Sequence, residues 1–327
     1  MNDTGHFILS FDTELGTGYF DRDIQRRRAT FSLDGSRERE AIRRLLDLCV
    51  KYQIKATWAV VGHLFYDQCE NCDICPILDW QNKYSTFDEV YQTNHPLWYG
   101  ADVIDLLIKF KDTQEIGFHG YVHTIFNENQ MSESEASIEI KEWLRVANRK
   151  GIQPSSIVFP RDRAGYHELF QKAGFLCFRS DPFESIWIRN KYFGRYLKVI
   201  DYLIGLSKIY VYEPKYKNVR GLIELSASQH LFNFNRGLEL KLDQLNLPHW
   251  RNQRIFKGIH RIAKEKKVMH LWAHPWEFRT DQDFIKIEKI LQLVNEYQNK
   301  GQIISSGMTD FATNLSLNHE KKVHNHV

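Results

Sequence analysis

Short apolar runs alternate along the chain with segments in which apolar residues recur every three or four positions. A short apolar run that ends at a polar residue or a glycine predicts a buried strand, whereas the wider spacing predicts a helix with one buried face. The predicted strands are 6–11, 55–61, 115–118, 156–159, 175–179, 221–225, 268–273 and 302–305. The predicted helices are about 36–52, 101–110, 132–147, 166–173 and 284–294. Strands that alternate with helices in this order form a parallel α/β sheet, either open or closed into a barrel.

Three stretches between these elements show no period and predict long loops. They cover 64–98, about 183–219 and about 230–264. Long loops in a compact domain are usually functional, so we expect these three to form the walls of a pocket. The polar segment 316–327 predicts a disordered tail, which leaves 1–315 as a single domain.

The composition narrows the class of protein without naming a reaction. Apolar residues make up 43% and charged residues 26% of the chain, as in soluble globular proteins. Lys and Arg (44) exceed Asp and Glu (41) by only 3, which argues against a nucleic-acid partner. The aromatic content of 13% fits a large core, and it also fits a sugar-binding cleft. The chain shows neither a signal-peptide pattern nor an apolar stretch of the ~18 residues that span a bilayer, so we expect a cytoplasmic protein.

Two local clusters allow more than one interpretation. Cys69, Cys72 and Cys75 have a spacing that suits part of a structural metal site, and it equally suits an exposed loop that is rich in cysteine. Arginines occupy 26–28, after the first strand. Such a run is usually a solvated surface, and the alternative is contact with the diphosphate of a nucleotide-linked or lipid-linked sugar.

Polar residues follow several of the predicted strands at the point where each strand ends. Asp12 and Glu14 follow the first strand, and residues two apart in an extended backbone point to the same face. His119 and His123 follow the third strand, and His274 follows a late one. The chemistry of parallel α/β folds lies at the carboxyl ends of the strands. Imidazoles together with a carboxylate are a usual ligand set for a catalytic divalent metal.

Each of these residues also has an ordinary structural interpretation. Asp12 is in a position to cap a turn, and the spacing of His119 and His123 occurs again in His270 and His274. His270 lies inside a predicted strand, which indicates a core residue. The stronger signal is that several such residues are expected at the same ends of several strands.

Five segments of the chain occur in the order and spacing of a known family. They read S-F-D-T-E, K-A-T-W-A-V-V-G, E-I-G-F-H-G-Y-V-H, F-P-R-D-R and H-P-W-E, from about residue 7 to about residue 277. Together they resemble the polysaccharide deacetylases, carbohydrate esterase family 4, and most of all the deacetylase-like members of surface-polysaccharide biosynthesis. The resemblance implies a distorted (β/α) barrel of about seven parallel strands with long loop insertions.

The resemblance also implies a metal-dependent hydrolase that removes acetyl groups from N-acetylated sugars, acting on a carbon–nitrogen bond that is not a peptide bond. His119 and His123 match the histidine ligands of the family. The usual pair of adjacent aspartates is replaced by Asp12-Thr13-Glu14, so Asp12 is expected as the base and Glu14 as the metal ligand, or the reverse. Zinc is the first expectation for the metal, with cobalt, nickel and manganese as alternatives.

Further catalytic roles follow from the same comparison. The arginine that orients the base matches Arg161, with Arg163 as the alternative. The histidine that protonates the leaving amine matches His274, and Asp181 loosely matches the acidic residue that tunes it. We also expect a backbone N–H near Tyr121 to stabilise the oxyanion.

Two other functions remain open for the same residues. One is a deformylase or another amide hydrolase, including one that opens a cyclic amide. The other is a metal-free relative that binds glycan without cleaving it, because the first and third motifs are altered. The expected partner is an N-acetylated sugar in a glycan, on a nucleotide or on a lipid. A lipid-linked sugar would imply peripheral contact with a membrane. Neither a nucleic-acid partner nor an integral membrane segment is expected. The sequence leaves the oligomeric state open.

Overall fold

The computed structural model describes residues 3–19, 29–68, 96–181, 208–232 and 250–324. Its strands form one sheet in the order β6-β7-β5-β4-β3-β2-β1-β9-β8, with β10 beside β1. The strands are β1 Gly5–Thr13, β2 Thr57–Val60, β3 Glu115–Phe118, β4 Ser156–Val158, β5 Cys177–Ser180, β6 Asn218–Val219, β7 Leu222–Ser226, β8 Gln229–His230, β9 Val268–Ala273 and β10 Ile303–Ser305. Only the β6–β7 pair is antiparallel among these named strands.

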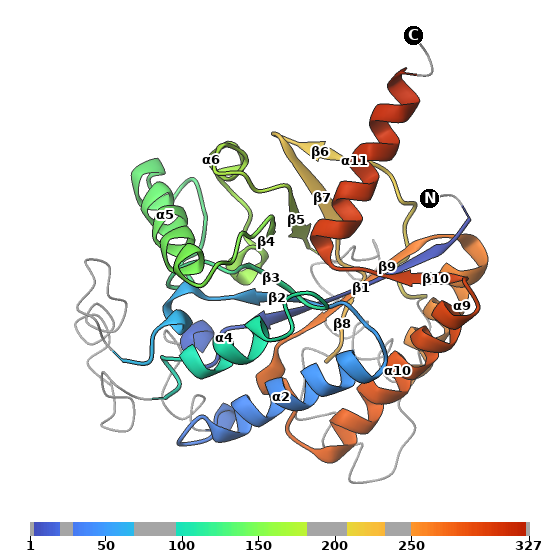
Figure 1. Cartoon of the computed structure of the whole chain (residues 1–327), viewed down its shortest axis with the longest axis horizontal. Helices are drawn as coiled ribbons and strands as arrows, with labels where there is room; N and C mark the ends of the chain where they lie inside the picture. The colour runs from blue at the N-terminus through green and yellow to red at the C-terminus, as the bar shows by residue number, and fades with distance from the viewer. Residues whose placement is uncertain (1–2, 20–28, 69–95, 182–207, 233–249, 325–327) are drawn as a thin grey trace, which may run out of the picture.

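Helices connect the strands and cover the sheet, which curls into part of a barrel (Figure 1). They are α2 Ser36–Lys51, α4 Ala101–Ile108, α5 Glu133–Arg149, α6 His167–Lys172, α9 Trp250–Glu265, α10 Asp281–Asn299 and α11 Met308–His324. All eight predicted strands are present, and the expected distorted (β/α) barrel is confirmed. The two strands that the sequence did not predict, β6 and β8, have two residues each and are too short to show a period.

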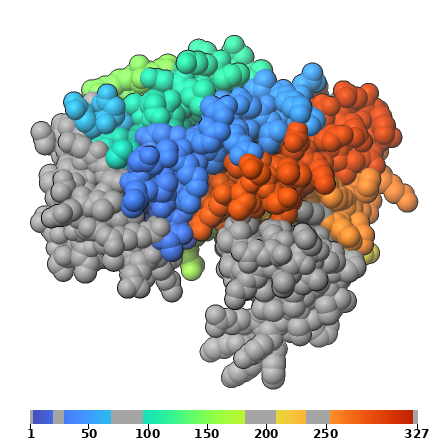
Figure 2. Space-filling view, turned by 90° about the horizontal axis from the view of Figure 1, so that it is seen from below, coloured from blue at the N-terminus to red at the C-terminus, as the bar shows by residue number. Residues whose placement is uncertain are grey.

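The helices α2 and α10 lie side by side on the surface (Figures 1 and 2). Ion pairs join them between Arg44 and Asp281 at 2.9 Å and between Lys51 and Glu288 at 2.7 Å. The guanidinium of Arg44 also lies 3.6 Å from the ring centroid of Phe284. These contacts hold together α2, which follows β1 along the chain, and α10, which follows β9.

Alternation along the central strands divides their side chains between two faces. In β1, Phe7, Leu9 and Phe11 belong to the large core under the helices, whereas Ile8 belongs to a second, smaller core. The smaller core is covered by α11, which contributes Met308, Phe311, Ala312 and Leu315. Ser10, Asp12 and Glu14 continue the series of Ile8 because side chains alternate with a period of two. This face of β1 is therefore apolar and covered by α11 at the amino end of the strand, and polar at the carboxyl end of the strand.

Two of the sequence predictions are wrong. The segment 230–264, predicted as irregular, contains α9, whose buried Ile255, Ile259 and Ile262 each contribute about 1.5–3 kcal/mol of burial free energy. The charged Lys257 and Arg261, together with Gly258, lie between these isoleucines and obscured the helical period. The segment predicted as a disordered tail is helical as far as residue 324, because α11 is anchored by its buried first turns and continues from them.

Several other predictions concern residues outside the described ranges. Cys69, Cys72, Cys75 and the arginines at 26–28 are among them, as is most of the predicted loops 64–98 and 183–219. Within the described residues, no helix is both long and apolar enough to cross a membrane.

Candidate metal centre and catalytic pocket

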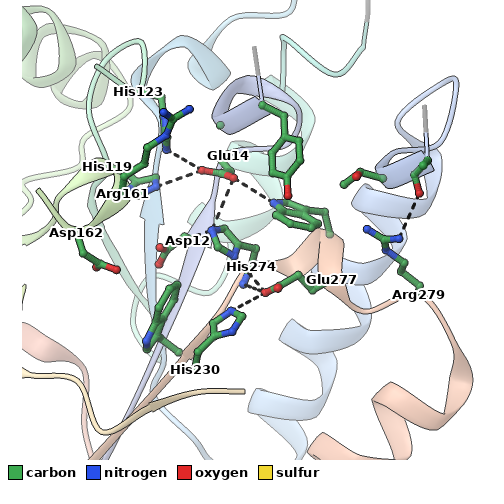
Figure 3. Close-up of a pocket in the computed structure, with 16 residues that line it drawn as sticks. Asp12, Glu14, His119, His123, Arg161, Asp162, His230, His274, Glu277 and Arg279 are labelled. Carbon is green, nitrogen blue, oxygen red and sulfur yellow. Dashed lines mark hydrogen bonds and ion pairs between the residues drawn. The ribbon is translucent and has the colours of Figure 1, made fainter. Parts of the chain in front are cut away.

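A cavity of about 620 Å³ opens at the carboxyl ends of the strands (Figure 3). Six residues that were singled out in the sequence line it, namely Arg161, Asp12, Glu14, His119, His123 and His274. Arg161 follows β4, and the other five come from the ends of β1, β3 and β9, which lie within four neighbouring strands of the sheet. Asp12 and Glu14 enter the cavity together because they share one face of β1.

Glu14, His119 and His123 form a buried cluster on one side of the cavity. The Glu14 Oε2 atom lies 2.9 Å from Nε2 of His123 and 3.4 Å from Nε2 of His119. Nδ1 of His119 lies 2.8 Å from the backbone oxygen of Val158, so this nitrogen carries the proton and Nε2 presents a lone pair. Nε2 of His119 is buried and makes no hydrogen bond to any described residue. A carboxylate oxygen and two imidazole nitrogens within 4.8 Å fit a divalent cation with open positions.

The electrostatics of this cluster agree with that fit. Burial acts to raise the pKa of Glu14, but the neighbouring His123 and His274 outweigh it and hold the pKa well below its usual range. Burial lowers the pKa of His123, and Glu14 only partly opposes this. Glu14 is therefore an anion and His123 a neutral imidazole at neutral pH, the protonation states that metal ligands require.

Glu139 of α5 holds the short loop between the two histidines. Its carboxylate accepts hydrogen bonds from the backbone N–H groups of Tyr121 at 2.8 Å and Val122 at 3.3 Å, and from the Thr124 hydroxyl at 2.8 Å. The Tyr121 N–H already donates to Glu139. It is therefore not the group that was expected to stabilise the oxyanion. Sequence reasoning missed Glu139, although a glutamate on the apolar stripe of a helix was the available signal.

Asp12 lies on the other side of the cavity and is paired with Arg179 of β5. The two guanidinium nitrogens of Arg179 donate to the two carboxylate oxygens of Asp12 at 2.6 and 2.7 Å, and Arg179 also donates to Asp162 at 2.9 Å. Both side chains are buried. Burial acts to raise the pKa of Asp12, but the Arg179 charge outweighs it and leaves the pKa below its usual value.

The expectation that Arg161 orients Asp12 is corrected by this pairing, since Arg179 makes the contact. Arg161 lies in a short helical turn after β4 with a φ of 54°, and its guanidinium lies beside His123 on the cavity wall (Figure 3). Arg179 shares the inner face of β5 with the buried Cys177, two residues before it. The signal that could have found Arg179 is an arginine at the carboxyl end of an otherwise apolar predicted strand.

His274 follows β9 and lies between the two carboxylates. Its Nε2 atom is 3.9 Å from Oδ2 of Asp12 and 3.8 Å from Oε1 of Glu14. Its Nδ1 atom is 3.1 Å from Oε2 of Glu277, which also accepts the His274 backbone N–H at 2.9 Å. Burial acts to lower the pKa of His274, but Glu14 and Glu277 raise it to about 10. Without a bound cation, the imidazole of His274 is therefore charged at neutral pH.

The carboxylate on His274 is Glu277 rather than the expected Asp181. Asp181 is exposed just after β5 and does not line the cavity. Glu277 closes a short helical turn, Pro275–Glu277, whose backbone brings its side chain back onto His274. A glutamate three residues after a histidine at a strand end was the signal in the sequence, since the side chain reaches the start of the turn.

Comparisons of the sequence with protein families and with curated proteins gave no match. Solved structures share the fold. A protein from Mycobacterium smegmatis assigned as a polysaccharide deacetylase matches with a TM-score of 0.60 at 14% identity, over 98% of this chain and 92% of its own. A second such protein, from Pseudomonas aeruginosa PAO1, matches with a TM-score of 0.55 at 12% identity, over 94% of this chain and 89% of its own. The Puue allantoinase matches with a TM-score of 0.53 at 13% identity over the same shares. The chain therefore has the polysaccharide-deacetylase fold that its motifs led us to expect.

Proposed function

We propose that this protein is a metal-dependent hydrolase that removes the acetyl group from an N-acetylated sugar. The observation that carries the proposal is the arrangement of three groups around one cavity. A potential metal site (Glu14, His119 and His123), an ionised carboxylate (Asp12) and a charged imidazole (His274) all face the same space. Amide hydrolysis needs an electrophile, a base and an acid, and these groups can supply all three.

A divalent cation held by Glu14, His119 and His123 would polarise the amide carbonyl and make a neighbouring water a better nucleophile. Zinc is the first choice for a site with two imidazoles and one carboxylate, and cobalt, nickel and manganese are alternatives. Each ligand is supported from outside the site. The Val158 carbonyl fixes the ring of His119, and Glu139 fixes the loop that leads to His123.

Asp12 is the proposed base that takes a proton from the attacking water. The two parallel hydrogen bonds from Arg179 hold its carboxylate in one orientation and keep it ionised. Arg179 also binds Asp162, so the guanidinium is itself fixed from a second direction. In this account Arg179 is a positioning residue, because it acts through Asp12.

His274 is the proposed acid, donating a proton from Nε2 to the leaving nitrogen. An amine is a poor leaving group until it is protonated, so this step decides whether the tetrahedral species collapses forward. Trp276 donates from its indole N–H to Glu14 at 3.1 Å, and with Tyr19 and Trp272 it lines the cavity. Aromatic rings of this kind offer flat apolar surfaces to a sugar.

A second candidate function is the hydrolysis of another amide on the same scaffold, such as a formyl amide or a cyclic amide. The fold similarity to an allantoinase favours keeping this candidate. The groups around Asp12 and Glu14 would serve either reaction, and the substrate is selected by the walls of the cavity. A non-catalytic glycan-binding protein is the less favoured reading, because Glu14 reaches both histidines despite the altered first motif.

The proposal is tested by acetate release from a panel of N-acetylated nucleotide sugars, lipid-linked sugars and glycans, with and without a chelator. The zinc-loaded protein is expected to release acetate from at least one class, and the chelator to abolish the activity. His119→Ala is expected to lose the activity while its circular dichroism stays native. His260→Ala, which changes an exposed histidine of α9, is the matched control. Full activity of His119→Ala would refute the proposal, and release of formate or ring opening in place of acetate would support the second candidate.

A further inference from the structure

A third imidazole, His230 of β8, borders the cavity beside the proposed acid. β8 pairs with β9, and His230 lies opposite Trp272 in the register. Nε2 of His230 lies 2.8 Å from Oε2 of Glu277. The same oxygen binds Nδ1 and the backbone N–H of His274, so Glu277 joins the two histidines (Figure 3).

Both ring nitrogens of His230 face hydrogen-bond acceptors. Its Nδ1 atom lies within hydrogen-bond distance of the backbone oxygen of Phe232, and a carbonyl oxygen can only accept. Its Nε2 atom faces a carboxylate oxygen of Glu277, which is also an acceptor. Burial acts to raise the pKa of Glu277, but His230 and His274 outweigh it and hold that pKa far below its usual range. The ring of His230 is therefore held between two acceptors, the Phe232 carbonyl and the Glu277 carboxylate.

The ring of His230 is also held from the side by Trp272. The two ring centroids lie 4.3 Å apart, and the guanidinium of Arg179 lies 4.1 Å from the Trp272 ring centroid. Trp272 therefore packs against the residue that orients Asp12 and against the residue that binds Glu277. This packing fixes His230 relative to the base as well as to the acid.

We propose that His230 is a positioning residue for the acid. It holds Glu277 from the side opposite His274, and Glu277 in turn fixes the His274 ring with Nδ1–H toward itself and Nε2 toward Asp12 and Glu14. This inference rests on the proposed function, since it assigns a role in delivering the proton to the leaving nitrogen. Without His230, the Glu277 carboxylate can rotate, and the direction of the Nε2–H of His274 is no longer fixed.

A second metal ion is the main competing explanation of this cluster. One ligand atom from each of His230, His274 and Glu277 lies within 4.8 Å of the other two. However, Oε2 of Glu277 already accepts three hydrogen bonds, one of them from a backbone N–H that the turn fixes in place. A cation bound here would have to share this oxygen with that backbone N–H, so the geometry favours shared protons.

The dependence on the leaving group separates a positioning role from a general structural role. An N-acetylated sugar needs a proton on its leaving nitrogen, whereas 4-nitrophenyl acetate releases a stable phenolate without one. For the zinc-loaded protein, His230→Ala is expected to lower kcat on the amide by about 10- to 100-fold, with KM nearly constant. Its kcat on the aryl ester is expected to change by less than about twofold. His230→Gln, which keeps an N–H donor toward Glu277, is expected to recover part of the loss, and His260→Ala is the control.

Three results would overturn the inference. They are an equal loss on both substrates, no loss on either, and a zinc content that falls from about two ions to about one per chain in His230→Ala. If the wild-type protein has no amide activity at all, the proposed function fails instead. The imidazole ¹⁵N NMR signals of His274 then decide the matter, because a change in these signals in His230→Ala supports the inference and unchanged signals contradict it.

Discussion

Asp12 and Glu14 lie two residues apart on one strand, are equally buried, and yet belong to different regions of the site. Asp12 is bound by the guanidinium of Arg179, 167 residues away in the chain. Glu14 is bound by two imidazoles and an indole N–H. The strand period brings both carboxylates to the same face, and their partners then divide the roles between them.

The partners also differ in the permanence of their charge. A guanidinium stays protonated at any physiological pH, so Asp12 always has its counter-ion. Burial favours the neutral imidazole at His123, so the charged neighbour of Glu14 is His274, and an imidazolium can lose its proton. A divalent metal would supply a permanent charge. The difference between the two regions therefore supports the proposal that Asp12 is the base and Glu14 the metal ligand.

The largest expected effect on activity is that of Asp12→Asn in metal-saturated protein. The amide keeps the size of the side chain but cannot take a proton from water, so kcat is expected to fall about 10²- to 10⁴-fold. Steady-state acetate release measures this, and circular dichroism checks the fold. A fall of less than tenfold would mean that Asp12 is not the base.

Arg179→Met sharpens the comparison from the side of the base. It leaves Asp12 and Asp162 without their shared cation, and breaking a buried pair in this way costs about 3–5 kcal/mol of unfolding free energy. We also expect kcat to fall about 100-fold, because the base loses its orientation. Denaturant unfolding and steady-state kinetics measure the two effects.

Arg161→Met is the matched control for that variant, since Arg161 lines the cavity and Arg179 binds Asp12. Its kcat is expected to stay within about tenfold of wild type, with no comparable loss of stability. If the two variants lost kcat equally, Arg161 would share the role of orienting the base.

Glu139→Gln tests the support of the metal side. The neutral amide accepts weaker hydrogen bonds from Tyr121, Val122 and Thr124, so the loop that carries His123 is less firmly held. We expect the Kd for zinc to rise about tenfold, as for other residues that orient metal ligands. Competition with a chromophoric chelator measures this, and Glu142→Gln on the same helix is the control. An unchanged Kd in Glu139→Gln would show that the loop needs no such support.

The smallest expected effect concerns Glu115, a buried carboxylate whose hydrogen-bond partners are the hydroxyls of Ser156 and Thr309 and the Thr309 amide. Burial raises its pKa, and these hydrogen bonds only partly oppose the rise. The folded protein thus binds this proton more tightly than the unfolded chain does. The stability from this group is present below the ordinary pKa of 4.5 and is lost as the pH rises through the higher folded value.

Glu115→Gln removes this titration. The unfolding free energy of the wild type relative to the variant should therefore fall as the pH rises above the ordinary pKa of 4.5, by about 1.4 kcal/mol for each unit of pKa difference. Urea unfolding at several pH values measures it. A difference between the two proteins that is constant with pH would contradict the account.

The sequence predicted the sheet and the position of the site, because both follow from local patterns. The alternation along the strands and the positions of their ends predicted that Asp12, Glu14 and His274 lie at the same edge of the sheet. It did not predict which side chains meet across the sheet, since the pairing of Asp12 with Arg179 depends on the order and register of β1 and β5.

The sequence did not predict the shortest elements, for a related reason. His230 lies in a strand of two residues, and a period of two cannot be recognised in so short a segment. Glu277 and Glu139 act through side chains that turn back toward a backbone N–H or a neighbouring loop. Such contacts are set by tertiary structure and leave little trace in apolar periodicity.

The central claim is that Glu14 holds the metal and Asp12 does not. It is tested most directly by the zinc content of Asp12→Asn and Glu14→Gln, measured side by side after zinc loading and removal of free metal. The account predicts about one zinc per chain in the wild type and in Asp12→Asn, and less than about a tenth of an equivalent in Glu14→Gln. Loss of zinc from Asp12→Asn with retention in Glu14→Gln would contradict the account and exchange the roles of the two carboxylates.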